Sequence, residues 1–267
     1  MKCSRARKAV VVFGLAAAML RAAPSPADEP TPVPARTVFE QNRESIVKVT
    51  GVAQIRISAD RPGMNAPERE EKVRADGTII DDRGLIVLSL SAIDPSRLID
   101  GREVKSAEGP VKVGATATLN ELEIILGDGT EIPATLVFKD EDLDLAFLRP
   151  KSDAPEAQGA TFDPIDLAAA GEVLVGDSTV SVTRLEDLFN NAPAMMAGQV
   201  SAVIERPRLL FVAPNAVRGC PTFTLDGKLI GIGIIRHRAT GVGQGSASPA
   251  IVPAGEIRKL VGQIPAG

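Results

Sequence analysis

Residues 126–148 have the sequence LGDGTEIPATLVFKDEDLDLAFL, and this stretch decides the fold class. Its Asp128-Gly129 pair separates two apolar segments, residues 121–126 and 132–138, and a third apolar segment follows at 143–148. Asp-Gly favours the positive φ angles that tight hairpin turns require. The stretch therefore predicts an antiparallel hairpin that leads into a further strand.

The same pattern of short apolar segments between turns extends in both directions. Upstream, residues 78–81 and 85–90 have strand character, and downstream a second Asp-Gly pair, Asp226-Gly227, lies between apolar segments. Regularly spaced strands without intervening helices indicate a barrel or a sandwich. Residues 150–164 are polar and poor in strand formers, which indicates a linker. We therefore expect an all-β chain of two β units of similar size.

The chain as a whole divides into segments of different character. A short helix is expected near residues 38–42, and a C-terminal helix is expected because Ile257, Leu260 and Val261 have helical spacing. Long polar stretches at 58–70, 94–117 and 238–248 are expected to be surface loops. The expected organisation is a signal peptide at 1–27, an N-terminal segment at 28–43, a first barrel at 44–150, a linker at 151–164, a second barrel at 165–253, and a helix and tail at 254–267.

The first 27 residues have the order of a secretory signal peptide. Four basic residues at positions 2, 5, 7 and 8 precede an apolar run at residues 9–20, and small residues follow as far as Ala27. The run is shorter than the roughly 20 residues that a membrane-spanning helix needs. We expect a soluble protein that is periplasmic or secreted, without stable membrane insertion, and a retained membrane anchor is the alternative.

The composition disfavours several classes of function. A hydrophobic content of 44% supports packed cores rather than disorder. Removal of the signal peptide would take away five basic residues and no acidic ones, so that the net charge becomes more negative than −4 and nucleic acid is disfavoured as a partner. Cys3 would leave with the signal peptide, so Cys220 has no disulfide partner. With His237 as the single histidine we expect no metal site and no cofactor.

Three segments in order resemble the HtrA/Deg group of trypsin-like serine proteases, which bacteria export. Residues 126–134 and 140–148 resemble the group's SDGxxxPA hairpin and the DxxxDLAxL strand that follows it. Residues 77–87 resemble the segment before the catalytic histidine, and residues 221–232 resemble the segment that follows the catalytic serine. The resemblance implies the chymotrypsin fold, two six-stranded antiparallel barrels with short N-terminal and C-terminal helices, and leaves no room for the PDZ domain that many members have.

The resemblance also assigns the three catalytic positions to residues of this chain. Asp144 occupies the position of the catalytic aspartate. Counting from Ile86-Val87, the position of the histidine is Ser91, and counting back from Pro221, the position of the nucleophilic serine is Arg218. Two of the three catalytic residues are thus replaced.

The replacements at positions 91 and 218 remove the groups on which catalysis by a serine protease depends. The neutral hydroxyl of Ser91 has no useful proton affinity near neutral pH, whereas an imidazole titrates there. The guanidinium of Arg218 stays protonated and is not a nucleophile. Ala216 stands where the group has a glycine of the oxyanion hole, and its Cβ disfavours the backbone conformation of that glycine. We therefore expect no peptidase activity.

Three further residues have a simpler interpretation than a catalytic one. Asp144 is expected to have a structural role in a well-packed strand. His237 lies between two arginines after a different strand of the second unit, and we expect an exposed residue at a strand end. The thiol of Cys220 would be an alternative nucleophile, but it stands two residues beyond the serine position without a recognisable base, and we expect a small buried side chain.

Arg218 has two possible roles in a site without its histidine. A carboxylate left unpaired in a partly buried cleft is costly, so we expect the Arg218 guanidinium to pair with Asp144, with Ser91 as a further hydrogen-bond donor. In the alternative, Arg218 points outward and anchors an acidic ligand. A distance of more than about 4 Å between the guanidinium and the Asp144 oxygens would reject the first arrangement.

The sequence leaves three functions open. The first is a pseudoprotease that binds a peptide or protein, or regulates one, without cleaving it. The second is an active HtrA-like serine-type endopeptidase, and the third is a structural component of the cell envelope. The expected partner is a protein or peptide, and a homo-oligomer is possible.

Overall fold

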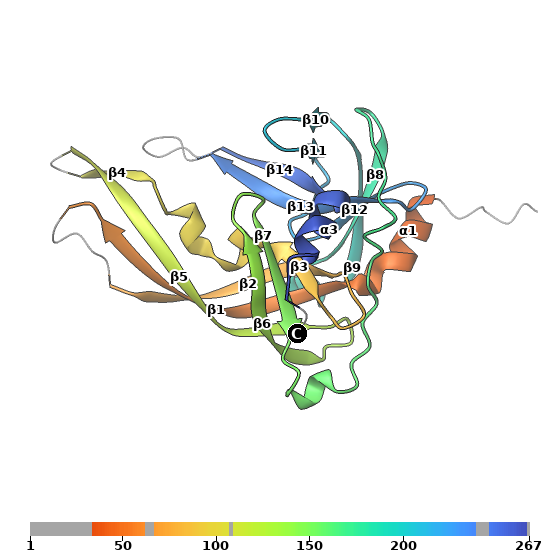
Figure 1. Ribbon diagram of the computed structural model, residues 1–267, viewed down its shortest axis with the longest axis horizontal. Coiled ribbons are helices and arrows are strands. Elements are labelled where there is room, and N and C mark those ends of the chain that lie inside the picture. Colours follow the sequence, from red (N-terminus) through yellow and green to blue (C-terminus); the bar gives the residue numbers. More distant parts are fainter. Residues whose placement is uncertain (1–33, 62–66, 107–108, 239–245, 266–267) are drawn as a thin grey trace, which may run out of the picture. The chain divides into compact units, whose positions relative to one another are not determined.

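The computed structural model describes residues 34–61, 67–106, 109–238 and 246–265, which are built mainly from antiparallel strands (Figure 1). The expected signal peptide lies outside these residues. Helix α1, Pro34–Asn42, confirms the short helix expected before the first strand. Among the helices of the described part, none is long and apolar enough to span a membrane. The other helical segments are η1 (Arg43–Ser45), α2 (Leu90–Ile93), η2 (Pro95–Leu98), η3 (Pro155–Ala157), η4 (Asp187–Phe189) and α3 (Ala254–Val261).

The first sheet contains seven strands in the order β1-β2-β3-β7-β6-β5-β4, and it closes because β1 also pairs with β5. The closure makes a six-stranded antiparallel barrel, to which β4 adds an outer strand. Its strands are β1 (Ile46–Ala59), β2 (Arg69–Ile79), β3 (Ile86–Ser89), β4 (Glu103–Ser106), β5 (Gly109–Ile125), β6 (Glu131–Asp140) and β7 (Leu145–Pro150).

The first barrel also corrects one expectation, because β4 and most of β5 lie where we expected a long surface loop at residues 94–117. Val111, Val113 and Ala115 are buried, while Lys112 between the first two and Thr116 after the third are exposed. This alternation is the pattern of a strand with one covered face. The polar side chains belong to its solvent-exposed face, which is why the stretch resembled a loop. The expected loops at 58–70 and 238–248 lie partly outside the described residues.

The second sheet is a curled seven-stranded sheet in the order β10-β11-β14-β13-β12-β8-β9. Only Val200 and Ser201 separate its two end strands in the sequence, and their N–H groups donate to the carbonyl oxygens of Asp177 and Val212 at 2.9 and 2.7 Å. The two sheets together confirm the two-barrel, all-β fold expected from the sequence. The strands are β8 (Ser178–Arg184), β9 (Pro193–Gln199), β10 (Ala202–Ile204), β11 (Leu210–Val212), β12 (Pro221–Thr224), β13 (Leu229–Arg238) and β14 (Ser246–Pro253).

Both Asp-Gly pairs form the turns expected of them. Gly129 lies between the antiparallel strands β5 and β6 and has φ +89°, and Gly227 lies between β12 and β13 and has φ +83°. Glycine adopts these angles without the steric cost that a Cβ would add. The hairpin predictions are therefore confirmed.

One hydrophobic cluster is shared by the two sheets, and α3 covers part of it. The expected C-terminal helix is confirmed at Ala254–Val261. Each sheet covers apolar side chains of the other, so that water is excluded from the boundary between them. The cluster includes Ile46, Val87 and Phe147 of the first sheet, Val180 and Phe223 of the second, and Ile257 of α3. Polar residues at this boundary are consequently held by packing on both sides.

Candidate functional site

Asp144 lies in the short connection between β6 and β7, and its backbone is unusual. Its φ is +56°, a left-handed conformation that aspartate tolerates better than most residues. The N–H of Leu143 donates to the Asp140 carboxylate at 2.8 Å, and the N–H of Leu90 donates to the carbonyl oxygen of Asp144 at 2.9 Å. These bonds hold the connection against α2. The Asp144 side chain is consequently buried, with the residue only 6% exposed.

Two serines and one backbone group donate hydrogen bonds to the Asp144 carboxylate. The hydroxyls of Ser89 and Ser91 donate to Oδ2 at 2.6 and 2.9 Å, and the N–H of Ser91 donates to Oδ1 at 2.8 Å. The expected hydrogen bond from Ser91 to Asp144 is therefore present. Ser89 is a partner that the sequence did not reveal, although it lies at the end of β3, two residues before Ser91.

Arg97 supplies the positive charge beside Asp144. Its Nε lies 3.7 Å from Oδ1 of Asp144, and one of its terminal nitrogens donates to the carbonyl oxygen of Glu141 at 2.7 Å. The Glu141 carboxylate lies 3.6 Å from the guanidinium and 2.8 Å from Nζ of Lys139. The hydrogen bond and the charge of Lys139 are the largest causes that lower the pKa of Glu141. Asp144 is thus part of a charged network that stays within the first barrel.

The expected ion pair between Arg218 and Asp144 is wrong. Among the described residues the cation within 4.0 Å of Asp144 is Arg97, and Arg218 has no ion pair. Arg97 lies on η2, which follows α2 closely, so the same short segment provides both Ser91 and Arg97. Arg218 instead belongs to a loop held by β13, since its backbone bridges to Gly233. Its side chain is half-buried, and within the described part it has no hydrogen-bond partner.

The loop before Arg218 also differs from an oxyanion hole. The N–H of Ala216 donates to the carbonyl oxygen of Ala213 at 3.0 Å, so it is not free to stabilise an oxyanion. Gly219 has φ +81°, and a Cβ there would lie 2.0 Å from the carbonyl oxygen of Asp76. The first barrel and β13 therefore fix this loop in a compact conformation.

Cys220 is enclosed completely, as expected for a small buried residue. It is 0% exposed, and its Sγ lies 3.4 Å from Oγ1 of Thr183 and 3.6 Å from Oδ2 of Asp76. Burial raises the pKa of the Cys220 thiol well above its usual value, and the negative charge of Asp76 raises it further. Because the thiolate is the nucleophilic form, this thiol is neither accessible nor activated.

His237 lies on β13 and is exposed, as the sequence indicated, but it also lines a pocket with Ser91 and Asp144. The pocket has a volume of about 240 Å³ and opens between the two sheets. Partial burial lowers the pKa of His237, and the positive charges of Arg218 and Arg102 lower it too, while Asp144 acts in the opposite direction. The sequence placed His237 on a different barrel from Ser91, which is correct, but did not reveal that both line one pocket.

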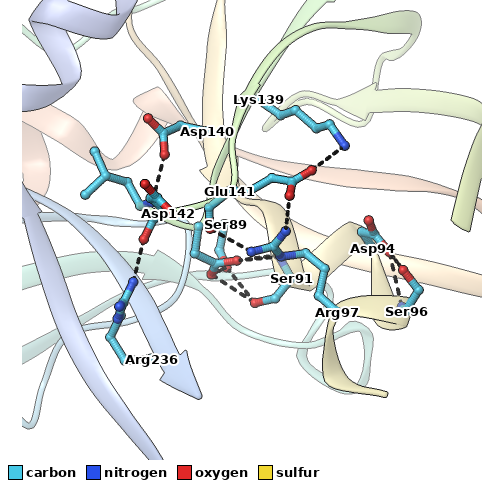
Figure 2. A network of polar contacts seen from close by, with 12 residues as sticks. Ser89, Ser91, Asp94, Ser96, Arg97, Lys139, Asp140, Glu141, Asp142 and Arg236 are labelled. Atoms are coloured by element: carbon cyan, nitrogen blue, oxygen red, sulfur yellow. Dashed lines mark hydrogen bonds and ion pairs between the residues drawn. The ribbon is translucent and has the colours of Figure 1, made fainter. Parts of the chain in front are cut away.

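Arg236 connects the two walls of this pocket (Figure 2). Its guanidinium donates to the carbonyl oxygen of Asp142 at 2.5 Å, across from β13 to the connection between β6 and β7. The Asp142 carboxylate lies 3.3 Å from a terminal nitrogen of Arg208, a second link between the barrels. Neither arginine was identified from the sequence as part of the site, because their partner Asp142 is 94 residues away from Arg236 and 66 residues away from Arg208.

The three positions of the implied triad therefore do not form a catalytic unit. Ser91 and Asp144 contact each other, whereas Arg218 lies apart from Asp144. In the described ranges, no imidazole is hydrogen-bonded to a hydroxyl or a carboxylate, and no group of three or more potential ligands could hold a metal ion. The site can bind and orient polar groups through its arginines, its serines and His237.

The chain matches a model of a known protein family. No curated protein matches the chain closely enough to count as a relative. The family model of the trypsin-like peptidase domain matches residues 75–232, more than half of the chain. The matched region includes the boundary between the two barrels and the residues at positions 91, 144 and 218. This chain therefore belongs to the family of trypsin-like peptidase domains.

Proposed function

We propose that the chain is an exported member of the HtrA/Deg type that binds extended peptides or unfolded segments without cleaving them. The fold supports a peptide-binding cleft between two barrels, and the pocket beside Asp144 lies at that boundary. The motifs at residues 126–148 support the HtrA/Deg assignment, and the first 27 residues support export.

The proposal rests on the hydrogen-bond and ion-pair partners of the Asp144 carboxylate. In a serine protease this carboxylate orients an imidazole. Here both of its oxygens accept hydrogen bonds from Ser89 and Ser91, and Arg97 supplies the opposite charge. The carboxylate of Asp144 is thereby satisfied without a hydrogen bond to an imidazole among the described residues.

Two further observations point in the same direction. The N–H of Ala216 is used in a bond to Ala213, so a tetrahedral intermediate would lack this donor. The thiol of Cys220 is buried and its pKa is raised, so it does not replace the missing serine. Loss of base, nucleophile and oxyanion donor together removes most of the rate enhancement of this machinery.

The direct test combines hydrolysis with binding. Purified protein consisting of residues 28–267 should leave casein intact, and it should bind at least some members of a panel of unstructured twelve-residue peptides, measured by fluorescence anisotropy. Cleavage that a serine-directed covalent inhibitor abolishes would contradict the proposal, and so would the absence of binding across the panel. Restoring the triad with Ser91→His and Arg218→Ser should not give full activity, because Ala216 remains engaged with Ala213.

A second candidate is favoured by one observation, the shared pocket of Ser91, Asp144 and His237. In this alternative Ser91 would be the nucleophile and His237 the base of an unconventional peptidase. The bond from the Ser91 hydroxyl to Asp144 opposes it, because that proton is directed at a carboxylate rather than at an imidazole. Casein cleavage that is lost in both Ser91→Ala and His237→Gln would establish this alternative.

A further inference from the structure

Exposed apolar side chains concentrate around one strand of the second sheet, β9. Eleven large apolar residues are exposed in the described part of the chain, and seven of them lie between residues 174 and 196. Soluble monomers rarely leave large apolar patches in water, so such a concentration indicates an interface. The seven residues form what we call the β9 surface: Leu174, Val175, Leu185, Leu188, Phe189, Met195 and Met196.

Strand β9 is an end strand of its sheet and has a free edge. On either side of β9, the N–H of Leu185 donates to the carbonyl oxygen of Ala192, and the N–H of Val200 donates to that of Asp177, at 2.9 Å each. The even-numbered residues of β9 therefore bond to β8, because the bonds of an antiparallel strand alternate between its two sides. The N–H and C=O groups at positions 195 and 197 point to the other side, where no backbone group of the described part bonds to them.

This edge lacks the charges that protect other strand edges of the molecule. The outer edge of β2 has four charged residues at 69–72, and β4 has Glu103 and Lys105. Charged side chains on an edge strand discourage another strand from pairing with it. Strand β9 has no charged residue, and Met195 and Met196 are both exposed although they point to opposite faces. The edge of β9 is therefore suited to accept a further strand.

Exposed apolar residues lie at both ends of β9, and this makes the surface self-complementary. Near its start, η4 exposes Leu188, which is 84% exposed. Near its end, Leu174 is 75% exposed on a turn whose Gly176 N–H donates to the carbonyl oxygen of Val200 at 2.8 Å. In an antiparallel pair of β9 strands the start of one lies opposite the end of the other. Leu188 of one copy would then face Leu174 of the second copy.

We propose that the β9 surface is the contact between two copies of this chain, whose β9 strands pair antiparallel about a two-fold axis at Met196. Met196 is the central residue of β9, so the free backbone groups of Met195 would pair with those of Ala197 in the second copy. If a fully exposed large side chain offers about 150 Å², the seven residues expose on the order of 600 Å². A standard interface buries about 800 Å² per partner, and the backbone of β9 adds to the side-chain area.

The first test measures association in solution. Residues 28–267 should form a dimer in analytical ultracentrifugation at about 50 µM, a range in which contacts of this size associate. Met195→Lys brings two like charges together near the two-fold axis and should weaken the dimer about tenfold or more. The matched control is Val104→Lys on the edge strand β4, because Val104 is 42% exposed and Met195 is 43% exposed. It should change the dissociation constant less than about twofold.

The second test addresses the antiparallel arrangement. Leu188→Lys and Leu174→Glu should each weaken the dimer about tenfold, because each places a charge in an apolar contact. The double variant should recover most of this loss, since each lysine then faces a glutamate of the second copy. Both side chains are exposed, so the variants should keep the circular dichroism spectrum and melting temperature of the unchanged protein.

Several outcomes would overturn the proposal, and none of them bears on peptide binding in the cleft. A monomer at about 50 µM would do so, and so would a dimer that Met195→Lys leaves intact or that Val104→Lys weakens equally. A double variant as weak as the single ones would reject the antiparallel arrangement. A monomer that binds an extended apolar peptide, and loses it in Met195→Lys, would assign the edge of β9 to a peptide instead of a second copy.

Discussion

At the residue scale, the environment of Asp144 explains how its buried carboxylate is satisfied without a histidine beside it in the first barrel. The space beside the carboxylate is occupied by hydroxyls rather than by a ring, and Arg97 neutralises the charge from the side. Every donor comes from the first barrel. The second barrel is thereby released from a role in holding Asp144, and Arg218 is available for other contacts.

The first prediction compares the two arginines. Arg97→Gln should destabilise the protein by about 1–3 kcal/mol, because it removes the charge beside a buried carboxylate. Arg218→Gln should change stability by less than about 0.5 kcal/mol, because the side chain has no ion pair among the described residues. Urea unfolding of both variants is the measurement, and a larger loss for Arg218→Gln would contradict the network described here.

The second prediction concerns Cys220. Because its thiol is buried and its pKa is raised, iodoacetamide at pH 8 should leave Cys220 unmodified in the folded protein of residues 28–267, which lacks Cys3, and should alkylate it only in urea. Above the ordinary thiol pKa of 9.0 the unfolded chain loses this proton while the folded chain keeps it. Stability should therefore fall as the pH rises through that range, and Cys220→Ala should show a smaller fall. Alkylation of the folded protein at the rate of a free thiol would refute this description.

At the scale of elements, the hairpins depend on backbone conformation more than on side-chain contacts. Gly129 turns the β5–β6 hairpin with φ +89°, and an added Cβ would meet nothing within 4 Å. Gly255 in the first turn of α3 also has open space around a Cβ, but its φ is not in the left-handed region. The two glycines thus differ in conformation and not in crowding.

The third prediction uses this pair. Gly129→Ala should destabilise the protein by about 1–2 kcal/mol, the cost of a left-handed conformation for a residue with a side chain. Gly255→Ala should be neutral or stabilising by up to about 1 kcal/mol, because alanine favours the helix. Thermal unfolding of the two single variants is the check, and equal effects would show that the turn does not require its glycine.

The elements that could be predicted from the sequence are those in which local chemistry and packing agree. The Asp-Gly hairpins and the C-terminal helix were predictable because turn residues and apolar spacing determine them locally. The strand β5 was not predicted along most of its length, because its exposed face is charged and polar. A strand that depends on β1 and β4 for its hydrogen bonds has little signal of its own.

At the scale of the whole molecule, buried polar side chains form hydrogen bonds that link the two barrels. Nζ of Lys48 on β1 lies 2.6 Å from Oδ1 of Asp76 and donates to the carbonyl oxygen of Arg184 on β8 at 3.1 Å. Thr183 donates to the other Asp76 oxygen at 3.1 Å. The hydroxyl of Thr78 donates to the carbonyl oxygen of Gly219 at 2.8 Å. These bonds cross the boundary beside the shared hydrophobic cluster.

The fourth prediction tests this link. Lys48→Met should destabilise the protein by about 3–5 kcal/mol, because it leaves the Asp76 carboxylate buried without its partner. The double variant Lys48→Met, Asp76→Leu should recover most of that loss, since two apolar groups leave no unpaired charge. Lys72→Met, an exposed residue on the same strand as Asp76, is the matched control and should be nearly neutral. Urea unfolding followed by circular dichroism distinguishes the three.

One contact of the candidate site was predictable and the others were not. Motif spacing assigned Ser91, Asp144 and Arg218 to the catalytic positions, which stays a prediction, and the expected hydrogen bond from Ser91 to Asp144 is present. That Arg97 and not Arg218 pairs with Asp144 depends on the orientation of η2 and on the anchoring of a loop to β13. Such orientations arise from packing between segments far apart in the chain, and no short stretch of sequence encodes them.

The occupied carboxylate of Asp144 also bears on the evolutionary history of the chain. Ser91 now has a structural task, so a reversion to histidine would remove a donor from a buried charge while serine at position 218 was still absent. A single change to histidine would therefore reduce stability. If the proposed loss of catalysis is correct, regaining hydrolysis requires simultaneous changes at several positions, including Ala216, and the contacts that Ser91 makes act as a ratchet against it.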